Sequence, residues 1–342
     1  MQCRSLIVGC FIMAIIGGAG VADVMDDCLN DHRPDVRIPA CTEIIADPHV
    51  TAENKAVGYI SRGNARIDAG ALQPAVADFT EAIRLKKDSA PAFAGRGRAN
   101  LLAGQLVGAI ADYKEAIRLS PTSAESYVEL GHAYIVDRNL DAAISALTQA
   151  IGLTPTSWGA FNERGIANYK KGELLQALDD FNKAIAIQPF SPELHANRGD
   201  VNEALARSKD AIDDFRQALF WDPSLVSARD ALKRLGAEEA ITAETDQRVR
   251  QGAALAEKYC SPCHAVGNIG ASPNKDAPEF RNINQGNGLY FLREPITQSV
   301  FAKHEKMPQF NLPFSEIDTV VAYINSISPA FSPYPSSNRS GR

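Results

Sequence analysis

The feature that most restricts the fold of this chain is a period of 34 residues that runs through its middle. A glycine returns at this spacing at five positions: Gly63, Gly97, Gly131, Gly165 and Gly199. Three further columns keep the same register, beginning at Ala75, Phe79 and Ala82. A proline ends each unit except the first, where Lys87 stands in its place. Five units in one register indicate an array of repeated supersecondary elements.

Each unit is predicted to be a hairpin of two helices. The glycine and alanine columns let the two helices approach closely, the large residue of the third column packs between neighbouring units, and the proline ends the second helix. In period and residue types the units resemble tetratricopeptide repeats (TPRs), which stack into helical solenoids. The resemblance implies an all-α fold in which residues 52–224 form five TPR units.

Both ends of such an array need covering, because an end repeat otherwise exposes its apolar face. At the N-terminal end, residues 23–51 are predicted to form a cap that a disulfide between Cys28 and Cys41 holds together. Two independent free thiols are the alternative. Thr51 is predicted to be the N-cap of the first repeat. At the other end, residues 225–248 are predicted to form a capping helix and a helix-permissive linker.

A motif near the C-terminus, Cys-Ser-Pro-Cys-His at residues 260–264, joins two thiols to an imidazole. Its spacing predicts a covalent haem c, with thioether bonds from Cys260 and Cys263 and with His264 as an axial iron ligand. A structural zinc site is one alternative, for which only His304 lies downstream as a further ligand. A thioredoxin-like pair is another, but it requires a strand-to-helix turn, whereas the preceding residues have a helical pattern. A chance match is the third.

The second axial ligand is predicted to be Met307, within the sequence His-Glu-Lys-Met-Pro at residues 304–308. Beyond residue 22 the only other methionine is Met25. A thioether is a known axial ligand of c-type haem. His304 is the rival ligand, and a methionine is also a common core residue.

Together these motifs make residues 249 to about 328 resemble a small class I cytochrome c. The likeness is to the compact bacterial group with a CSPCH motif, an APEF-type loop and an HxxMP loop. It implies one haem c per chain, held between His264 and Met307. It also implies that the carbonyl of Pro278 accepts a hydrogen bond from the His264 ring and so fixes its tautomer.

Two helices are predicted to enclose this domain. The first covers residues 249–259, and the second runs from an N-cap at Ser315 to Ile327. The resemblance implies that they cross, with Gly252 allowing Tyr323 to approach closely. The haem would then lie in a small all-α domain that follows the solenoid.

Residues 1–22 are predicted to be a secretory signal peptide. Arg4 precedes an apolar run over residues 6–16 that is too short to span a bilayer, and small residues lead up to Ala22. A retained anchor or a lipoprotein signal around Cys10 is the alternative, and no lipid anchor is expected. A disulfide and covalent haem attachment both fit an exported protein, so the predicted compartment is the periplasm.

Charge differs between the two parts of the chain. Residues 1–248 carry a net charge of −8 and residues 249–342 a net charge of +2, within a total of −6. The cytochrome c domain is predicted to end near residue 330, and residues 331–342 are predicted to be a disordered polar tail. A mildly basic haem domain suits transient contact with an acidic redox partner. No basic stripe suited to nucleic acid is present.

The groove of the array is the predicted docking site for that partner. Positions that face the groove in TPR proteins hold a mixed set: Asn64, Arg98, His132, Tyr169, Asp200 and Glu203. For at least half of them, an ordinary solvated position is the alternative. The histidines show no metal-ligand spacing with one another and no paired carboxylates stand out, so the chain is predicted not to be an enzyme on its own.

The predicted function is a periplasmic one-electron carrier with a His/Met haem c. It would dock on a periplasmic or membrane-bound redox protein through its TPR groove. The alternative is an interaction or assembly protein that uses the haem as a redox sensor. A peroxidase-type enzyme is a third hypothesis, which would require Met307 to leave the iron.

Overall fold

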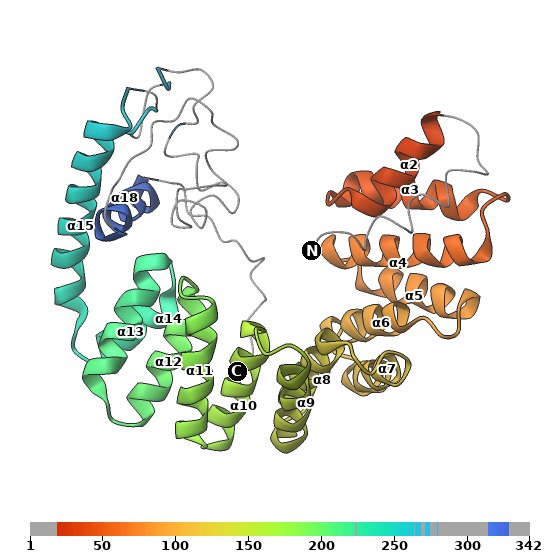
Figure 1. The fold of residues 1–342 in the computed structure, drawn as a ribbon, viewed down its shortest axis with the longest axis horizontal. Helices are drawn as coiled ribbons and strands as arrows, with labels where there is room; N and C mark the ends of the chain where they lie inside the picture. Colours follow the sequence, from red (N-terminus) through yellow and green to blue (C-terminus); the bar gives the residue numbers. More distant parts are fainter. Residues whose placement is uncertain are drawn as a thin grey trace. The chain divides into compact units, whose positions relative to one another are not determined.

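The computed structural model describes residues 19–222, 224–262, 264–267, 271–273, 279 and 314–327. Every regular element in these ranges is an α-helix, so the predicted all-α fold is confirmed. The chain divides into two compact units, Met1–Glu173 and Leu174–Arg342 (Figure 1). Within the described part of the chain, no helix combines the length and the apolar character needed to cross a membrane.

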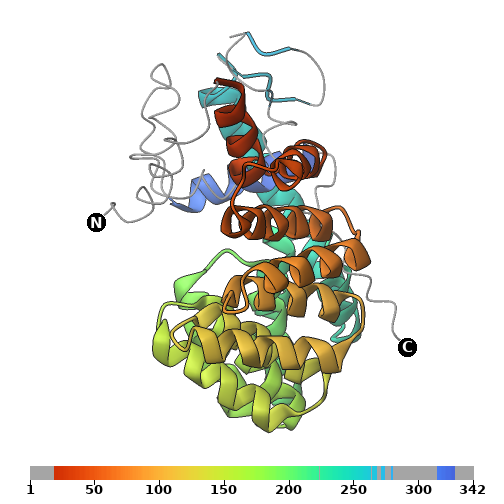
Figure 2. The ribbon, with the colours of Figure 1, turned by 90° about the vertical axis from the view of Figure 1, so that its right-hand side faces the viewer.

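In the first unit, consecutive helices pack against one another in chain order, as the red to yellow-green ribbons of Figures 1 and 2 show. Two helices, α2 and α3, precede the repeats. The helices of this unit are α2 (Ala19–Asn30), α3 (Pro34–Ala46), α4 (Ala52–Asp68), α5 (Leu72–Leu85), α6 (Ala90–Leu102), α7 (Leu106–Leu119), α8 (Ala124–Val136), α9 (Leu140–Leu153) and α10 (Trp158–Lys171).

The second unit continues with helix pairs and ends with the two helices of the C-terminal domain. Its helices are α11 (Leu174–Ile187), α12 (Pro192–Ala204), α13 (Ser208–Trp221), α14 (Val226–Arg234), α15 (Glu238–Tyr259) and α18 (Phe314–Ile327). Helix α14 is the predicted capping helix. It buries Ala228, Ala231 and Leu232 against Phe215 of the preceding helix.

Two helix boundaries differ from the prediction. Helix α15 begins at Glu238 and passes through residue 249 without a break, so the expected linker and the first helix of the C-terminal domain form one helix of 22 residues. The linker carries no helix-breaking proline, so nothing stops helix propagation there. Helix α18 begins at Phe314, so Ser315 lies within its first turn and the predicted N-cap is wrong.

The glycine column allows the two helices of each hairpin to touch. A Cβ atom added to Gly63 would lie 2.8 Å from the ring of Phe79, and one added to Gly97 would lie 3.0 Å from the ring of Tyr113. The ring of Phe79 also lies against Gly95 of the next repeat. These large side chains are fully buried. The predicted packing of this column between neighbouring units is therefore confirmed.

A buried ion pair recurs inside the hairpins, and the sequence analysis missed it. The pairs are Arg62–Asp78 at 2.7 Å, Arg96–Asp112 at 2.7 Å and Arg198–Asp214 at 2.6 Å. Each arginine lies on the first helix of a repeat and each aspartate lies 16 residues later on the second. The signal was present in the sequence, because both residue types return at the 34-residue spacing.

The third repeat replaces this ion pair with two apolar residues. Leu130 and Ala146 occupy the equivalent positions, and both are buried in one hydrophobic cluster with Tyr113. Both partners change together, so neither charge is left buried alone. That is the substitution pattern expected where a lone buried charge is costly.

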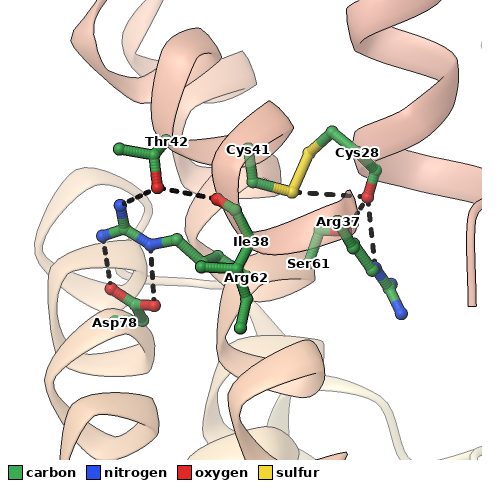
Figure 3. The surroundings of a disulfide bond; sticks show 8 residues. All are labelled: Cys28, Arg37, Ile38, Cys41, Thr42, Ser61, Arg62 and Asp78. Carbon is green, nitrogen blue, oxygen red and sulfur yellow. Dashed lines mark hydrogen bonds and ion pairs between the residues drawn. A yellow bond between two sulfur atoms is a disulfide. The ribbon is translucent and has the colours of Figure 1, made fainter. Parts of the chain in front are cut away.

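The predicted disulfide between Cys28 and Cys41 is confirmed. It joins α2 to α3, both cysteines are fully buried, and their Cα atoms lie 4.7 Å apart. Arg37 donates hydrogen bonds to the carbonyl of Cys28 at 3.2 Å and to the hydroxyl of Ser61 at 3.0 Å (Figure 3). Because Ser61 lies on α4, this network ties the N-terminal cap to the first repeat.

The start of the first repeat also agrees with the prediction. The hydroxyl of Thr51 accepts a hydrogen bond from the amide of Asn54 at 3.3 Å, which makes Thr51 the N-cap of α4. On the same helix, Arg62 reaches back to the hydroxyl of Thr42 at 2.9 Å while it pairs with Asp78 (Figure 3). One side chain therefore bonds to both the cap and the second helix of the repeat.

Candidate functional site

The Cys-Ser-Pro-Cys-His motif begins where α15 ends. Cys260 is the C-cap of this helix, and its amide donates to the carbonyl of Ala256 at 2.8 Å. The amide of His264 donates to the carbonyl of Cys260 at 2.9 Å, which closes one further turn. The motif therefore follows a helix, and the strand-to-helix turn that a thioredoxin-like pair requires is not what precedes it.

Helices α15 and α18 cross closely beside this turn. A Cβ atom added to Gly252 would overlap the carbonyl group of Thr319 and would lie 2.9 Å from the Cβ atom of Tyr323. The expected close approach of Tyr323 to Gly252 is thereby confirmed. Only a residue without a side chain lets the two backbones come this near.

A small hydrophobic cluster surrounds the crossing. Its buried members are Ala256, Val266 and Ile324, and four half-buried residues pack on it: Cys260, Val320, Tyr323 and Ile327. The cluster joins the end of α15, the residues after the motif and the inner face of α18. Burial holds the turn against both helices.

The two residues after His264 make further hydrogen bonds. The amide of Ala265 donates to the hydroxyl of Ser272 at 3.0 Å. The hydroxyl of Tyr323 donates to the carbonyl of Val266 at 2.6 Å. Burial, followed by the charge of Glu257, raises the pKa of Tyr323, so this hydroxyl remains a donor at neutral pH. Pattern analysis missed both contacts, because neither leaves a local signal.

The donor atoms of the motif fit a covalent haem c. One thiol and one imidazole, from Cys260 and His264, belong to a single turn, and both residues are half-buried. Cys263, Met307 and Pro278 lie outside the described residues, as does His304, the rival to Met307. Within the described residues, no group of three or more His, Cys, Asp or Glu side chains could hold a metal ion.

Several of the predicted groove residues pair with the neighbouring repeat. Arg98 lies 3.8 Å from Asp68, His132 lies 3.0 Å from Glu163, and Glu203 lies 2.9 Å from Arg234. The first two pairs join the first helices of adjacent repeats, and the third joins the last repeat to the capping helix α14. These polar groups are therefore not simply solvated.

The other predicted groove residues differ in how exposed they are. Asn64 and Asp200 are half-buried, and Tyr169 is 38% exposed. Three exposed apolar residues, Val57, Leu102 and Val136, lie on the first helices of repeats one to three. They are not among the predicted groove residues. Their exposure could not be read from sequence, because apolar residues on these helices serve both core and surface positions.

Comparison with known proteins identifies the C-terminal domain. Residues 247–324 match a family profile described as cytochrome c oxidase, cbb3-type, subunit III. Cytochrome c-552 of Bradyrhizobium diazoefficiens is 35% identical over 78 residues, which make up 23% of this chain and 73% of the relative. The chain belongs to the cytochrome c family. Its cytochrome c domain contains the turn described above and the crossing of α15 with α18.

The repeats match two further profiles, described as TPR repeat and tetratricopeptide repeat, over residues 97–135 and 128–192. Among solved structures, PilF of Pseudomonas aeruginosa is similar, with a TM-score of 0.50 and 16% identity over 58% of this chain and 92% of that chain. MamA has a TM-score of 0.44 and 25% identity over 47% of this chain and 94% of that chain. The likeness to PilF shows the fold, a stack of TPR hairpins.

Proposed function

We propose that this chain is a periplasmic one-electron carrier, in which a cytochrome c domain with one covalent haem c is brought to a redox protein by a TPR array. The observation that carries the proposal is the turn of residues 260–264 at the end of α15. It lies in the domain that is similar to cytochrome c-552 and is held by packing and hydrogen bonds. A carrier needs a cofactor site that is rigid, because a site that moves on electron transfer slows the exchange.

Five residues are proposed to hold the haem. Cys260 and Cys263 attach it through thioether bonds, His264 and Met307 are the axial ligands, and the carbonyl of Pro278 orients the imidazole of His264. When bound, haem c supplies a reversible one-electron couple, and two axial ligands from the protein leave no iron position for a substrate. The protein therefore has no proposed catalytic residue.

The remaining side chains of the turn give the attachment site an apolar side. Cys260 packs against the buried cluster of Ala256, Val266 and Ile324, which limits the access of water to its side chain. The hydrogen bond from the amide of His264 to the carbonyl of Cys260 keeps the thiol and the imidazole in one turn. The protein's own contacts thus hold the Cys260 thiol and the His264 imidazole close together in the chain fold.

The TPR array is proposed to dock a protein partner through its groove. Redox complexes formed by small cytochromes bury little surface, commonly less than about 1,200 Å². A docking module on the same chain raises the effective concentration of the haem at one target. The ion pairs Arg98–Asp68, His132–Glu163 and Glu203–Arg234 support this role, because they link the neighbouring helices that line a TPR groove.

The proposed organisation follows from these roles. It comprises a signal peptide (1–22), a disulfide-stapled cap (23–51), five TPR units (52–224), a capping helix and linker (225–248), the cytochrome c domain (249–330) and a tail (331–342). Cleavage after Ala22 would remove the first turn of α2 and retain Cys28. A buried disulfide and covalent haem both favour the periplasm, and no lipid anchor is proposed.

Haem attachment is tested by mass spectrometry of peptides after acid-acetone extraction. The peptide that contains residues 260–264 should retain the mass of one haem. Loss of the haem together with free thiols at Cys260 and Cys263 would contradict the proposal. A Cys28→Ser, Cys41→Ser variant is the control, because it removes two thiols from the chain without touching the motif.

Axial ligation is tested with Met307→Ala. The native protein should exclude carbon monoxide and cyanide, and the variant should bind them, because it opens an iron position. His304→Ala is the matched control and should leave the native spectrum unchanged. If His304→Ala opens the site and Met307→Ala does not, His304 is the ligand.

The carrier and sensor roles are separated by reduction kinetics of the intact protein. Fast, reversible electron exchange with redox proteins from the same periplasm supports the carrier. Slow exchange that changes which proteins the TPR array retains would instead support the redox sensor.

A further inference from the structure

Two side chains from distant segments hold the residues that follow His264. The amide of Ala265 donates to the hydroxyl of Ser272 at 3.0 Å, and the carbonyl of Val266 accepts from the hydroxyl of Tyr323 at 2.6 Å. The second bond joins residues that are 57 positions apart in the chain. The backbone after His264 is therefore attached both to Ser272 and to α18.

The two backbone groups that make these hydrogen bonds belong to buried residues. Ala265 and Val266 are each only 9% exposed, so a lost partner would leave a backbone group poorly solvated. Bonds of this kind are more costly to break than bonds on the surface. The stretch after His264 is thus held in one conformation as long as both partners remain.

Tyr323 is itself fixed at its other end. Its Cβ atom lies where α18 presses against Gly252, so the side chain starts from the closest point of the helix crossing. Its hydroxyl then ends on the carbonyl of Val266. One residue therefore links the position of α18 on α15 to the position of the backbone beside His264.

We infer that Tyr323 is a positioning residue for His264, and that Ser272 restrains the same backbone through the neighbouring peptide group. The inference rests on the proposed function, in which His264 is an axial ligand of the iron. Hydrogen bonds beyond the ligands themselves orient a ligating imidazole and adjust the properties of the metal. A change in how α18 packs on α15 would then alter the orientation of His264 through the hydroxyl of Tyr323.

The test is Tyr323→Phe in the full-length holoprotein, which removes the hydroxyl and keeps the ring. The variant should retain covalent haem but change the paramagnetic NMR shifts of the haem methyl groups and the reduction potential. Ser272→Ala should change the same two quantities. Both readouts depend on how the imidazole is oriented, so loss of stability alone does not move them.

The matched control is Tyr113→Phe in the repeats. It removes a comparable hydroxyl, which donates to Glu129 at 3.0 Å from a fully buried ring. This variant should lose stability while its haem methyl shifts and potential remain those of the native protein.

Hydrogen exchange gives a readout that does not depend on the haem signals. In Tyr323→Phe the amide of Ala265 keeps its bond to Ser272 but should exchange about fivefold faster, because loss of the bond to Val266 makes local opening of this stretch easier by about one net hydrogen bond. Faster exchange with unchanged methyl shifts and potential would overturn the positioning role and leave Tyr323 a merely structural residue. If the native protein carries no haem at all, the proposed function fails instead, so the two failures are distinguishable.

Discussion

Single residues decide how charge is buried inside the TPR hairpins. Asp112 is 6% exposed and accepts from Arg96, and Asn100 donates to it at 3.1 Å. A carboxylate at this depth is tolerated only because it is paired. In the third repeat Leu130 and Ala146 occupy the equivalent positions and fill this part of the core without any charge. Neither solution leaves a charged group alone in the core.

In the second repeat, the ion pair can be replaced by the apolar pair of the third repeat. Arg96→Ala should lower the free energy of unfolding by about 3 kcal/mol, because it leaves Asp112 without its cation. The double variant Arg96→Leu, Asp112→Ala copies the third repeat and should recover at least half of that loss. Urea unfolding followed by circular dichroism measures both. A double variant that is no more stable than the single one would show that the two repeats are not interchangeable here.

The fifth repeat holds another buried carboxylate, Asp214, at which polar contacts offset the cost of burial. Burial acts to raise the pKa of Asp214, but the nearby His195, whose Nδ1 lies 3.7 Å away, and the hydrogen bonds from Arg198 and Asn202 outweigh it and hold this pKa below its ordinary value. The stability that Asp214 contributes is therefore complete at neutral pH and is lost as the pH falls through that lowered pKa. The same network explains why this aspartate can remain ionised in a core.

At the scale of elements, ion pairs between first helices hold neighbouring repeats together. His132 on α8 bonds to Glu163 on α10, and this hydrogen bond, which outweighs the opposing effect of burial, raises the pKa of His132. A raised pKa means that the folded state favours the protonated imidazole. The stability from this pair is therefore fully present below about pH 6.5 and is lost as the pH rises through the raised value.

The pair predicts a pH-dependent effect of Glu163→Gln. The melting temperature of the variant should fall further below that of the native protein at pH 5.5 than at pH 9. Glu53→Gln is the control, because Glu53 pairs with Lys86 at 2.7 Å and a lysine does not titrate in this interval. The Glu53 difference should stay nearly constant. An equal difference at both pH values for Glu163→Gln would show that His132 is not charged in the pair.

Helix α15 also acts as an element that spans a domain boundary. Its C-terminal end carries Cys260, and upstream the guanidinium of Arg248 lies over the ring of Phe220 on α13, 5.4 Å from the ring centroid. One helix therefore contacts the last repeat and ends at the turn of the Cys-Ser-Pro-Cys-His motif. The cytochrome c domain is joined to the array by a helix rather than by a flexible segment.

At the scale of the whole molecule, the disulfide and the proposed haem site lie near opposite ends of the sequence. The disulfide Cys28–Cys41 lies in the first compact unit, and the proposed haem site lies in the second. In the chain-entropy model a disulfide that closes a short loop acts by restricting the unfolded chain. Loss of the disulfide should therefore lower the stability of the N-terminal cap and leave the proposed haem site unchanged.

The double variant Cys28→Ser, Cys41→Ser tests this separation. It should lower the free energy of unfolding of the first unit by about 3 kcal/mol and leave the haem spectrum unchanged. Thr51→Ala removes one capping hydrogen bond close by and should cost only about 1 kcal/mol. A changed haem spectrum in the double variant would show that the two ends are coupled.

The sequence by itself determined the class of each part of this protein. The period of the glycine column predicts helical hairpins, because local spacing decides which side chains share a helix face. The Cys-Ser-Pro-Cys-His motif predicts its chemistry for a similar reason, since all its donors lie within one turn. The cysteine pair was predictable because few partners remain once the motif is set aside.

Only the tertiary structure decided which distant residues meet. The pairing of His132 with Glu163 and the bond from Tyr323 to Val266 join separate helices or segments. Local pattern does not specify such contacts, because they depend on how helices cross and how closely they pack. The overlap that a side chain at Gly252 would make with Thr319 is one such consequence of packing.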